Sequence, residues 1–365
     1  MITNYSRFLR DAGVLVLSLF AFVVSGACET TVGVIVPLSG GAADYGLAIR
    51  NSIELARERN PELFTDIRFE YEDATYDPRV ALTAFQKLAD SNHSDIIVTW
   101  GVSACKALAP VAEARKVPLI GICIDPETAR GRRYVMRFMN TIDDYMQETV
   151  SHLRRSGIKK IVVLVSEHPY LAEMRAALDR TRTAELSIDY LDSIPPTEQD
   201  FRTHIRRIKQ GTFDGVGVFL FVGQIATFFK QSKQLQLGIP TFGTNFCESA
   251  SETSASEGAM NGSLFAGNII TPEFAALHQQ RFGSESQLTF GVPAYAMAMT
   301  IGRLFNSQPA QSADDVMERL QGIGEQEVPL VGKFRYARDD HGGAHIEFPL
   351  TMKRIDGNRF EPVAK

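Results

Sequence analysis

The most constraining feature of the chain is a regular alternation of apolar, β-branched runs with segments whose apolar residues have helical spacing. The alternation runs from residue 30 to residue 124 and predicts a parallel sheet with helices on both faces. The expected strands are 30–40, 67–74, 95–100 and 117–124, and the expected helices are 44–60, 77–91 and 105–116.

The same alternation then starts again, which predicts a second α/β unit. Its expected strands are 159–167, 187–194, 214–222 and 240–245, and its expected helices are 145–157, 171–182, 200–211 and 224–238. Two further helices, 292–307 and 313–323, precede a strand-rich tail. In such sheets ligands bind beyond the carboxyl ends of the strands, so two doubly wound α/β lobes predict a ligand cleft between them.

Size and charge agree with this organisation. A chain of 365 residues accommodates two domains. The formal net charge is −5, and the short Arg-Arg pairs suit solvated helix faces. A clustered basic face is missing from the sequence, which argues against nucleic-acid binding.

The N-terminus has the composition of an export signal. Arg7 and Arg10 precede an apolar run, Ala12 to Val24, which is short for a transmembrane helix. Small residues follow, up to Cys28. We expect residues 1–27 to be a signal peptide. Two versions remain open, an ordinary signal and a lipoprotein signal that leaves an acylated Cys28.

The remaining cysteines do not have the spacing of a zinc site. A bridge between Cys105 and Cys123 is one possibility in an oxidising compartment, and buried free thiols are the other. His341 and His345 flank two glycines, a pattern that favours a hairpin turn over a metal pair. We expect neither a cofactor nor a metal.

The segment from Gly101 to Cys105 has two interpretations. It resembles the nucleophile elbow of a serine hydrolase, but Cys105 stands where the second glycine belongs, and the seven histidines lie in no catalytic block. Alternatively, Ser103 caps a helix whose first backbone N–H groups bind an anion. A plain N-cap without a ligand is the third possibility.

Several blocks, in this order, resemble the type I periplasmic solute-binding proteins of ABC importers, in particular the branched-chain amino acid binding group. The likeness covers the chain after the expected signal. The blocks are VGVIVPLSGGAADYG, YEDATYDPRVALTAFQKL, APVAEARKVPLI, DPETARGRRYVMRFMNTIDDY, FRTHIRRIKQGTFDGVGVF and GKFRYARDDHGG.

The resemblance implies two lobes joined by three hinge crossings, near Met139, Gly267 and Ile346. It implies a non-enzymatic protein of the periplasm that captures a small molecule by hinge closure and delivers it to an ABC permease. Contact with the membrane is expected only through that permease or a lipid on Cys28. The expected lobes are 28–139 with 268–345 and 140–267 with 346–365.

The resemblance also implies candidate site residues. Ser103 is expected to hold a ligand carboxylate, with Cys105 beside it. Tyr170 matches a cleft-wall tyrosine, and Tyr45 is similarly placed in the first loop. Further candidates for the cleft are Phe221, Phe290, Ile124 and Asn245.

Two of these positions depart from the amino acid binders. Ile124 stands where a hydroxyl residue is usual, and Asn245 stands where an acid usually meets the ligand's ammonium group. A buried ammonium needs a negative partner, for which Glu248 and Asp125 are the alternatives. The ligand is therefore expected to be an amino acid or another small carboxylate or amide.

Three classes of function stay open at this point. The first is the solute-binding protein of an importer. The second is a ligand-sensing cleft protein that is not coupled to transport. The third is a hydrolase that uses Ser103 or Cys105.

Overall fold

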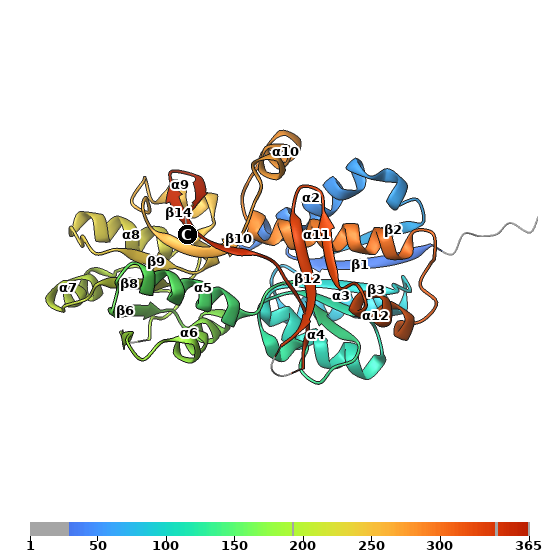
Figure 1. The fold of residues 1–365 in the computed structure, drawn as a ribbon, viewed down its shortest axis with the longest axis horizontal. Coiled ribbons are helices and arrows are strands. Elements are labelled where there is room, and N and C mark those ends of the chain that lie inside the picture. The colour runs from blue at the N-terminus through green and yellow to red at the C-terminus, as the bar shows by residue number, and fades with distance from the viewer. Residues whose placement is uncertain (1–28, 192, 340–341, 364–365) are drawn as a thin grey trace, which may run out of the picture.

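The computed structural model describes residues 29–363, except residue 192 and residues 340–341. The expected signal peptide, residues 1–27, and Cys28 lie outside the described residues. The described chain forms two lobes side by side along the long axis, each built on one sheet (Figure 1). This two-lobe α/β architecture confirms the predicted fold class.

The first lobe contains an eight-stranded sheet among the described residues. Its strands are β1 (Thr30–Val36), β2 (Ile67–Asp73), β3 (Ile96–Trp100), β4 (Leu119–Ile122), β5 (Val135–Arg137), β11 (Glu325–Val328), β12 (Gly332–Arg338) and β13 (Ala344–Glu347). The order is β11-β12-β13-β5-β4-β3-β1-β2. The strands from β13 to β2 pair in parallel, and the hairpin strands β11 and β12 add an antiparallel edge.

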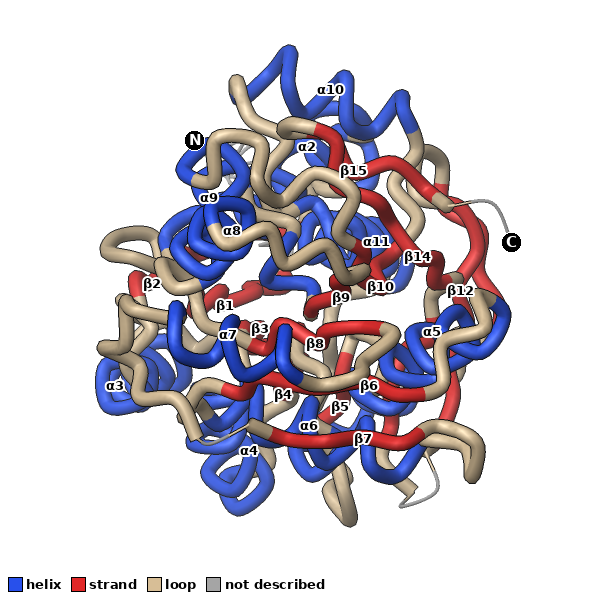
Figure 2. Tube along the Cα trace, turned by 90° about the vertical axis from the view of Figure 1, so that its left-hand side faces the viewer, coloured by secondary structure: helices blue, strands red, loops and turns tan. Residues whose placement is uncertain are grey.

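Helices cover both faces of this sheet. They are α2 (Ala43–Arg59), α3 (Pro78–Asp90), α4 (Val102–Arg115), α11 (Leu288–Phe305) and α12 (Ala313–Gln321), with the short turns η1 (Pro61–Leu63) and η2 (Pro126–Thr128). Successive strand side chains point to opposite faces. Val34 packs in the cluster with α2 and α11, whereas Ile35 packs with α3 and α4. Figure 2 shows α2 and α11 above the strands and α3 and α4 below them.

The second lobe contains a seven-stranded sheet, again counted over the described residues. Its strands are β6 (Lys160–Val165), β7 (Ser187–Tyr190), β8 (Gly215–Phe219), β9 (Thr241–Gly243), β10 (Leu264–Asn268), β14 (Leu350–Asp356) and β15 (Arg359–Pro362), in the order β15-β14-β10-β9-β8-β6-β7. Its helices are α5 (Ile142–Arg155), α6 (Pro169–Thr181), α7 (Arg202–Gln210), α8 (Ile225–Gln234), α9 (Ala250–Ala255) and the turn η3 (Asn245–Cys247).

The chain passes between the sheets at three places in the described residues. The first lies between β5 and α5, at 138–141. The second follows β10 and leads to α10 (Pro272–Phe282), which contacts α2. The third joins β13 to β14 through residues 348–349. Each connection is short.

Two of the lobe boundaries expected from the sequence fall inside strands. The boundary after residue 267 cuts β10, and the boundary after residue 345 cuts β13, because Ile346 still pairs with Tyr336 of the first sheet. The strand β13 continues past the expected boundary to Glu347. We therefore place the lobe boundaries at the three connections given above, and the resulting lobe ranges are a proposal.

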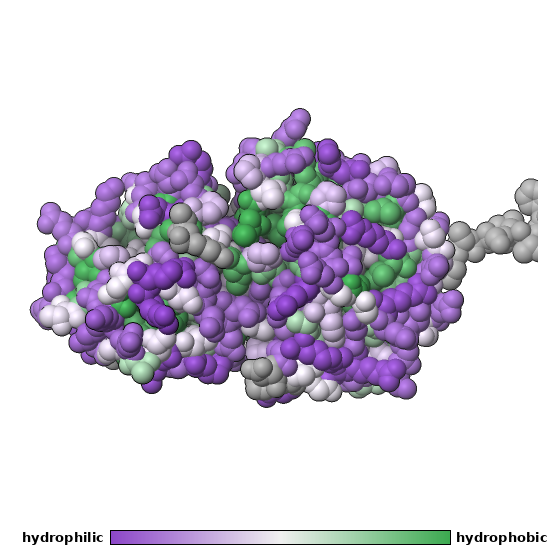
Figure 3. Space-filling model, viewed as in Figure 1, coloured by the Kyte–Doolittle hydropathy of each residue, from purple (hydrophilic) through white to green (hydrophobic). Residues whose placement is uncertain are grey.

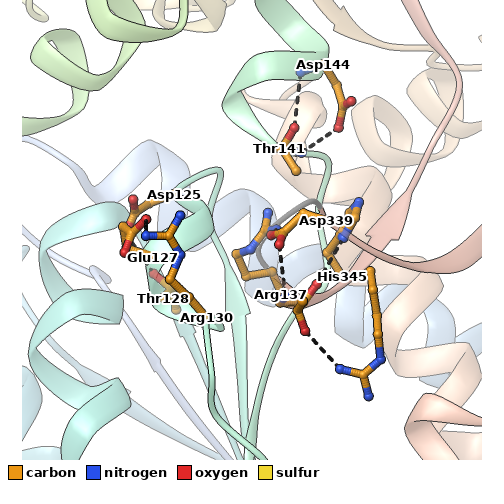
Figure 4. A network of polar contacts seen from close by, with 12 residues as sticks. Asp125, Glu127, Thr128, Arg130, Arg137, Thr141, Asp144, Asp339 and His345 are labelled. Carbon is orange, nitrogen blue, oxygen red and sulfur yellow. Dashed lines mark hydrogen bonds and ion pairs between the residues drawn. The ribbon is translucent and has the colours of Figure 1, made fainter.

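Polar contacts surround the first crossing (Figure 4). The fully buried Arg137, at the end of β5, donates from Nη2 to Asp339 Oδ2 at 2.8 Å. On the other side of the crossing, Thr141 and Asp144 cap α5 reciprocally, side chain to backbone. Side-chain contacts therefore hold the chain on both sides of the first crossing.

Candidate functional site

A cavity of about 300 Å³ lies between the two lobes. Every lining residue belongs to a loop or helix start that follows a strand, or to the last position of a strand, as expected for this class of sheet. The first lobe contributes Gly41, Ala42, Tyr45, Thr75, Tyr76 and Trp100, and the second contributes Phe221, Val222 and Phe246. In Figure 3 the surface is indented between the lobes, and hydrophobic residues are visible there.

Two other hollows have similar volumes, but neither is lined by strand-end loops of both lobes. One, of about 330 Å³, is lined mainly by α5 and by Thr181 and Thr183 in the second lobe. The other, of about 310 Å³, is lined by β11–β13 and Pro349. A ligand in either hollow would not contact the facing loops of both lobes. The cavity that both lobes line is therefore the candidate site.

The first-lobe wall of the cavity is a group of packed aromatic rings. Tyr45 stacks on Trp100, with ring centroids 4.8 Å apart and an interplanar angle of 23°. Phe290 supports both rings edge-on from α11, at 5.7 Å from Tyr45 and 5.4 Å from Trp100. Tyr76 lies 5.4 Å from Trp100. These contacts fix the orientation of the wall.

The second-lobe wall is also aromatic. Phe221 lies 5.6 Å from Phe246 and stacks on His168 at 4.4 Å. Phe246 packs on Tyr170 at 4.3 Å. Burial lowers the pKa of His168, so the neutral imidazole belongs to this wall near pH 7.

The two walls touch each other. Tyr45 and Phe246 approach edge-to-face at 5.8 Å, and Tyr76 lies nearly parallel to His168 at 6.3 Å. An ion pair also joins the lobes, Lys106 Nζ to Glu173 Oε1 at 3.3 Å. The structure therefore represents an arrangement in which the lobes are already close.

Three buried polar atoms beside the cavity have no hydrogen-bond partner among the described residues. They are Tyr45 Oη, Trp100 Nε1 and Asn245 Nδ2, on side chains that are at most 4% exposed. The indole and amide nitrogens can only donate. Buried polar groups are normally paired, so these atoms indicate a place for a bound group.

The buried carboxylates near the cavity interact with other groups of the protein. Glu248 Oε2 accepts from Lys353 Nζ at 2.9 Å, and both side chains are buried. Asp125 accepts from Thr128 Oγ1 through Oδ2, whereas its buried Oδ1 has no hydrogen-bond partner among the described residues and lies 3.8 Å from Lys106 Nζ. Glu252 accepts from the backbone N–H groups of the loop that leads into α8. None of these acids lines the cavity.

Ser103 is not the helix cap. The helix α4 begins at Val102, with Gly101 in the N-cap position at a φ of 89° and no side-chain cap. Because glycine tolerates this backbone conformation, the helix starts earlier than the sequence predicted. Ser103 lies in the first turn, half-buried, and its hydroxyl hydrogen-bonds with the Tyr76 side chain, which lines the cavity.

Cys105 and Ile124 are buried and do not line the cavity. Cys105 and Cys123 are buried free thiols on either side of Gly121. Burial and the neighbouring Cys123 thiol raise the pKa of Cys105 well above its ordinary value. Ile124 is buried in the core just before Asp125.

The other candidates lie in or directly behind the walls. Tyr45 and Phe221 line the cavity. Phe290 supports the first-lobe wall, and Tyr170 supports Phe246. Tyr170 also donates its phenol hydrogen to Asn245 Oδ1, which leaves Asn245 Nδ2 as the unpartnered end of the amide.

Three lining aromatics were missed from the sequence, namely Tyr76, Trp100 and Phe246. A signal existed for Trp100, which is the single tryptophan and ends a buried strand immediately before a glycine and a helix. Phe246 belongs to the short turn η3, for which the sequence has no periodic pattern.

The hydrolase interpretation finds no support in the surroundings of its two nucleophiles. The neighbour of the Ser103 hydroxyl is a phenol, and the neighbour of the Cys105 thiol is a second thiol. Over the described ranges, no group of three or more potential metal ligands comes together. Likewise, none of the described helices is long and apolar enough to cross a bilayer.

Comparison with known proteins agrees with this geometry. The family model for periplasmic binding proteins matches residues 29–353, so the chain belongs to that family. Comparison with curated proteins gives no match. The family's members are solute-binding proteins, which are not enzymes.

Solved structures share the fold at low sequence identity. The leucine-binding protein LivK of Thermotoga maritima is 17% identical, with a TM-score of 0.80 over 92% of this chain and 98% of that one. LivJ of Streptococcus pneumoniae, in complex with isoleucine, is 15% identical, with a TM-score of 0.79 over 92% and 99%. A solute-binding protein of Rhodopseudomonas palustris, in complex with 3,4-dihydroxybenzoic acid, is 22% identical, with a TM-score of 0.78 over 92% and 96%.

Proposed function

We propose that this protein captures a small molecule between its two lobes and delivers it to the permease of an ABC importer. The observation that carries the proposal is the cavity lined by aromatic side chains of both lobes. A ligand there contacts both lobes at once, so it favours the closed arrangement over open ones.

The short connections at 138–141, 269–271 and 348–349 serve as the hinges. Opening about them separates Tyr45 from Phe246 and breaks the pair between Lys106 and Glu173. Closure brings these contacts back around the ligand. Tyr45 and Phe221 act as facing walls, with Tyr170 and Phe290 behind them.

Ser103 and the start of α4 are proposed to bind an anionic group of the ligand. The first turn of a helix has backbone N–H groups without intrahelical partners, and no side chain caps this one. The Ser103 hydroxyl adds a donor at this turn. Cys105 and Ile124 support this turn from below.

A thermal-shift screen of amino acids, aliphatic acids, aromatic acids and amides tests capture. A ligand at 100 times its dissociation constant adds about 2.7 kcal/mol of stability. Small-angle scattering with the best ligand should show compaction. If no class of ligand stabilises the protein, capture is refuted, and binding without compaction refutes hinge closure.

Delivery to a permease is the part that separates an importer from a sensor. We expect cells without this protein to lose uptake of the radiolabelled ligand and the wild-type gene to restore it. Normal uptake in its absence, with ligand binding intact, points to the sensing function.

Export is proposed on the family and on the sequence of the first 28 residues. Mass spectrometry of the protein from its native host should find a mature chain that begins at Cys28, with or without acyl groups. A mature chain that still starts at Met1 refutes export.

A further inference from the structure

We propose that the cavity selects a planar aromatic carboxylate and rejects ligands with an ammonium group. The inference rests on the proposed capture of a small molecule and names the chemical class of that molecule. It follows from three independent features of the described residues around the cavity, which are the charges, the rings and the unpartnered donors.

The first feature is that no carboxylate lines the cavity to balance a positive ligand. Glu248 is paired with Lys353 and also accepts the Thr289 N–H at 3.1 Å. Both oxygens of Glu252 accept backbone N–H groups. An ammonium group closed into this cavity would lose its water without a carboxylate in the cavity wall to compensate its charge.

The second feature is the ring geometry. Five of the lining side chains are aromatic, and they come from both lobes. Their flat faces and edges bound a space of about 300 Å³, at the small end of ligand pockets. A planar ring can pack against these faces at van der Waals distance, whereas a branched aliphatic group of equal volume contacts them less completely.

Aromatic walls of this kind can also surround a quaternary ammonium ion. The third feature argues against that occupant. Trp100 Nε1 and Asn245 Nδ2 are buried donors without partners, and they demand an acceptor.

Matched ligand pairs test the charge and the ring separately. Calorimetric titrations compare 3-phenylpropanoate with L-phenylalanine, which differ by the ammonium, and benzoate with cyclohexanecarboxylate, which differ by the flat ring. Benzyltrimethylammonium represents the cation. We expect each aromatic acid to bind at least about tenfold more tightly than its partner, and the cation not to bind.

The outcomes distinguish this inference from the proposed function. Tighter binding of amino acids, aliphatic acids or the cation overturns the aromatic carboxylate but leaves capture standing. Absence of binding by every member of this panel and of the broader screen overturns both.

The variant Asn245→Asp tests the unpartnered donor directly. It keeps the acceptor for the Tyr170 phenol but replaces the Nδ2 donor with a carboxylate oxygen. We expect the aromatic acid to bind at least about tenfold more weakly, and the preference over L-phenylalanine to shrink or reverse. Circular dichroism and a melting curve verify that the variant is folded.

The matched control is Asn358→Asp, which adds the same charge on the second lobe. Asn358 is exposed and accepts from Thr253 Oγ1 through Oδ1, an acceptor that the substitution also keeps. Its affinity should equal that of the wild type. Equal affinities of both variants for both ligands would show that Asn245 does not face the ligand and would overturn the assignment.

Discussion

Tyr45 stacks on Trp100 at the inner wall of the first lobe, yet the phenol oxygen of the one and the indole nitrogen of the other have no hydrogen-bond partner among the described residues. Both side chains are only 4% exposed. Leaving a buried polar group unpaired costs about 1–3 kcal/mol. The ligand-free protein is therefore less stable at this wall than it would be with apolar groups, and a ligand with acceptors removes that penalty.

The first prediction separates stability from affinity at Tyr45. In Tyr45→Phe the unpartnered hydroxyl is gone, so the free energy of unfolding should stay equal or rise by about 1 kcal/mol. Affinity for the ligand should fall about two- to tenfold, because one hydrogen bond to the ligand is lost. Denaturant unfolding and calorimetry measure the two quantities.

The control for this change is Tyr295→Phe. The hydroxyl of Tyr295 is buried in α11 and hydrogen-bonds with Asn60, away from the cavity. This variant should lose about 1 kcal/mol of stability and bind the ligand normally. If Tyr45→Phe behaves like Tyr295→Phe, the hydroxyl of Tyr45 is structural and does not contact the ligand.

The second prediction concerns the ion pair between the lobes. Glu173→Gln removes the partner of Lys106 on the opposite lobe and so favours open states. Because both side chains are partly exposed, affinity should fall only about two- to fivefold. The difference from wild type should diminish in high salt.

Glu257→Gln is the matched substitution within one lobe. Glu257 pairs with Lys230 at 2.7 Å, and both residues belong to the second lobe. Its removal should leave the ligand affinity unchanged at every salt concentration. Equal affinities of the two variants would mean that the pair across the cleft does not contribute to closure.

The third prediction addresses the buried pair of Glu248 and Lys353. Lys353→Met leaves a fully buried carboxylate without its cation, and should destabilise the protein by about 3–5 kcal/mol. The double variant with Glu248→Gln should recover most of that loss, because the uncompensated charge is gone. A loss below 1 kcal/mol in the single variant, by denaturant unfolding, contradicts the assignment of a compensated buried charge.

The fourth prediction is a pH dependence at Asp73. Burial alone would raise its pKa, but hydrogen bonds from Ser39, Leu38 and Thr75 outweigh this and lower it below 3.8. A carboxylate with a lowered pKa in the folded state adds stability above the unfolded pKa, and this is lost as the pH falls through the folded pKa. The contribution of Asp73 should thus be complete at pH 7, begin to fall near the unfolded pKa of about 4, and disappear only below the folded pKa.

Asp73→Asn should therefore be less stable than the wild type at pH 7, and the difference should vanish at low pH. The same variant should weaken ligand binding, because Asp73 holds the loop in which Thr75 and Tyr76 line the cavity. A stability difference that is constant from pH 3 to pH 7 would refute the linkage.

The sequence predicted the order of the central elements because buried parallel strands are continuous apolar runs. All seven residues of β1 are buried, and helices such as α3 begin at a recognisable Asp-Pro cap. Short elements escaped prediction. The three-residue strand β5 and the six-residue helix α9 have too few residues to express a period.

The site was less predictable than the fold, because it depends on how the two lobes approach each other. Tyr45 was identified by its place in the first loop of the resembling family and Phe221 as a candidate apolar wall, whereas Phe246 reaches the cavity from a turn of three residues. The cap assigned to Ser103 was wrong because Gly101 starts the helix. The pairing of Glu248 with Lys353 joins residues 105 positions apart, which one sequence cannot reveal.

The central claim is that ligand binds between the lobes against Trp100, and the emission of that residue tests it most directly. Trp100 is the single tryptophan of the chain and lines the cavity, so its fluorescence reports this wall alone. Titration with the ligand found by calorimetry should change the emission in a saturable way, with the dissociation constant measured by calorimetry. Binding that saturates by calorimetry while the Trp100 emission stays constant would contradict the account.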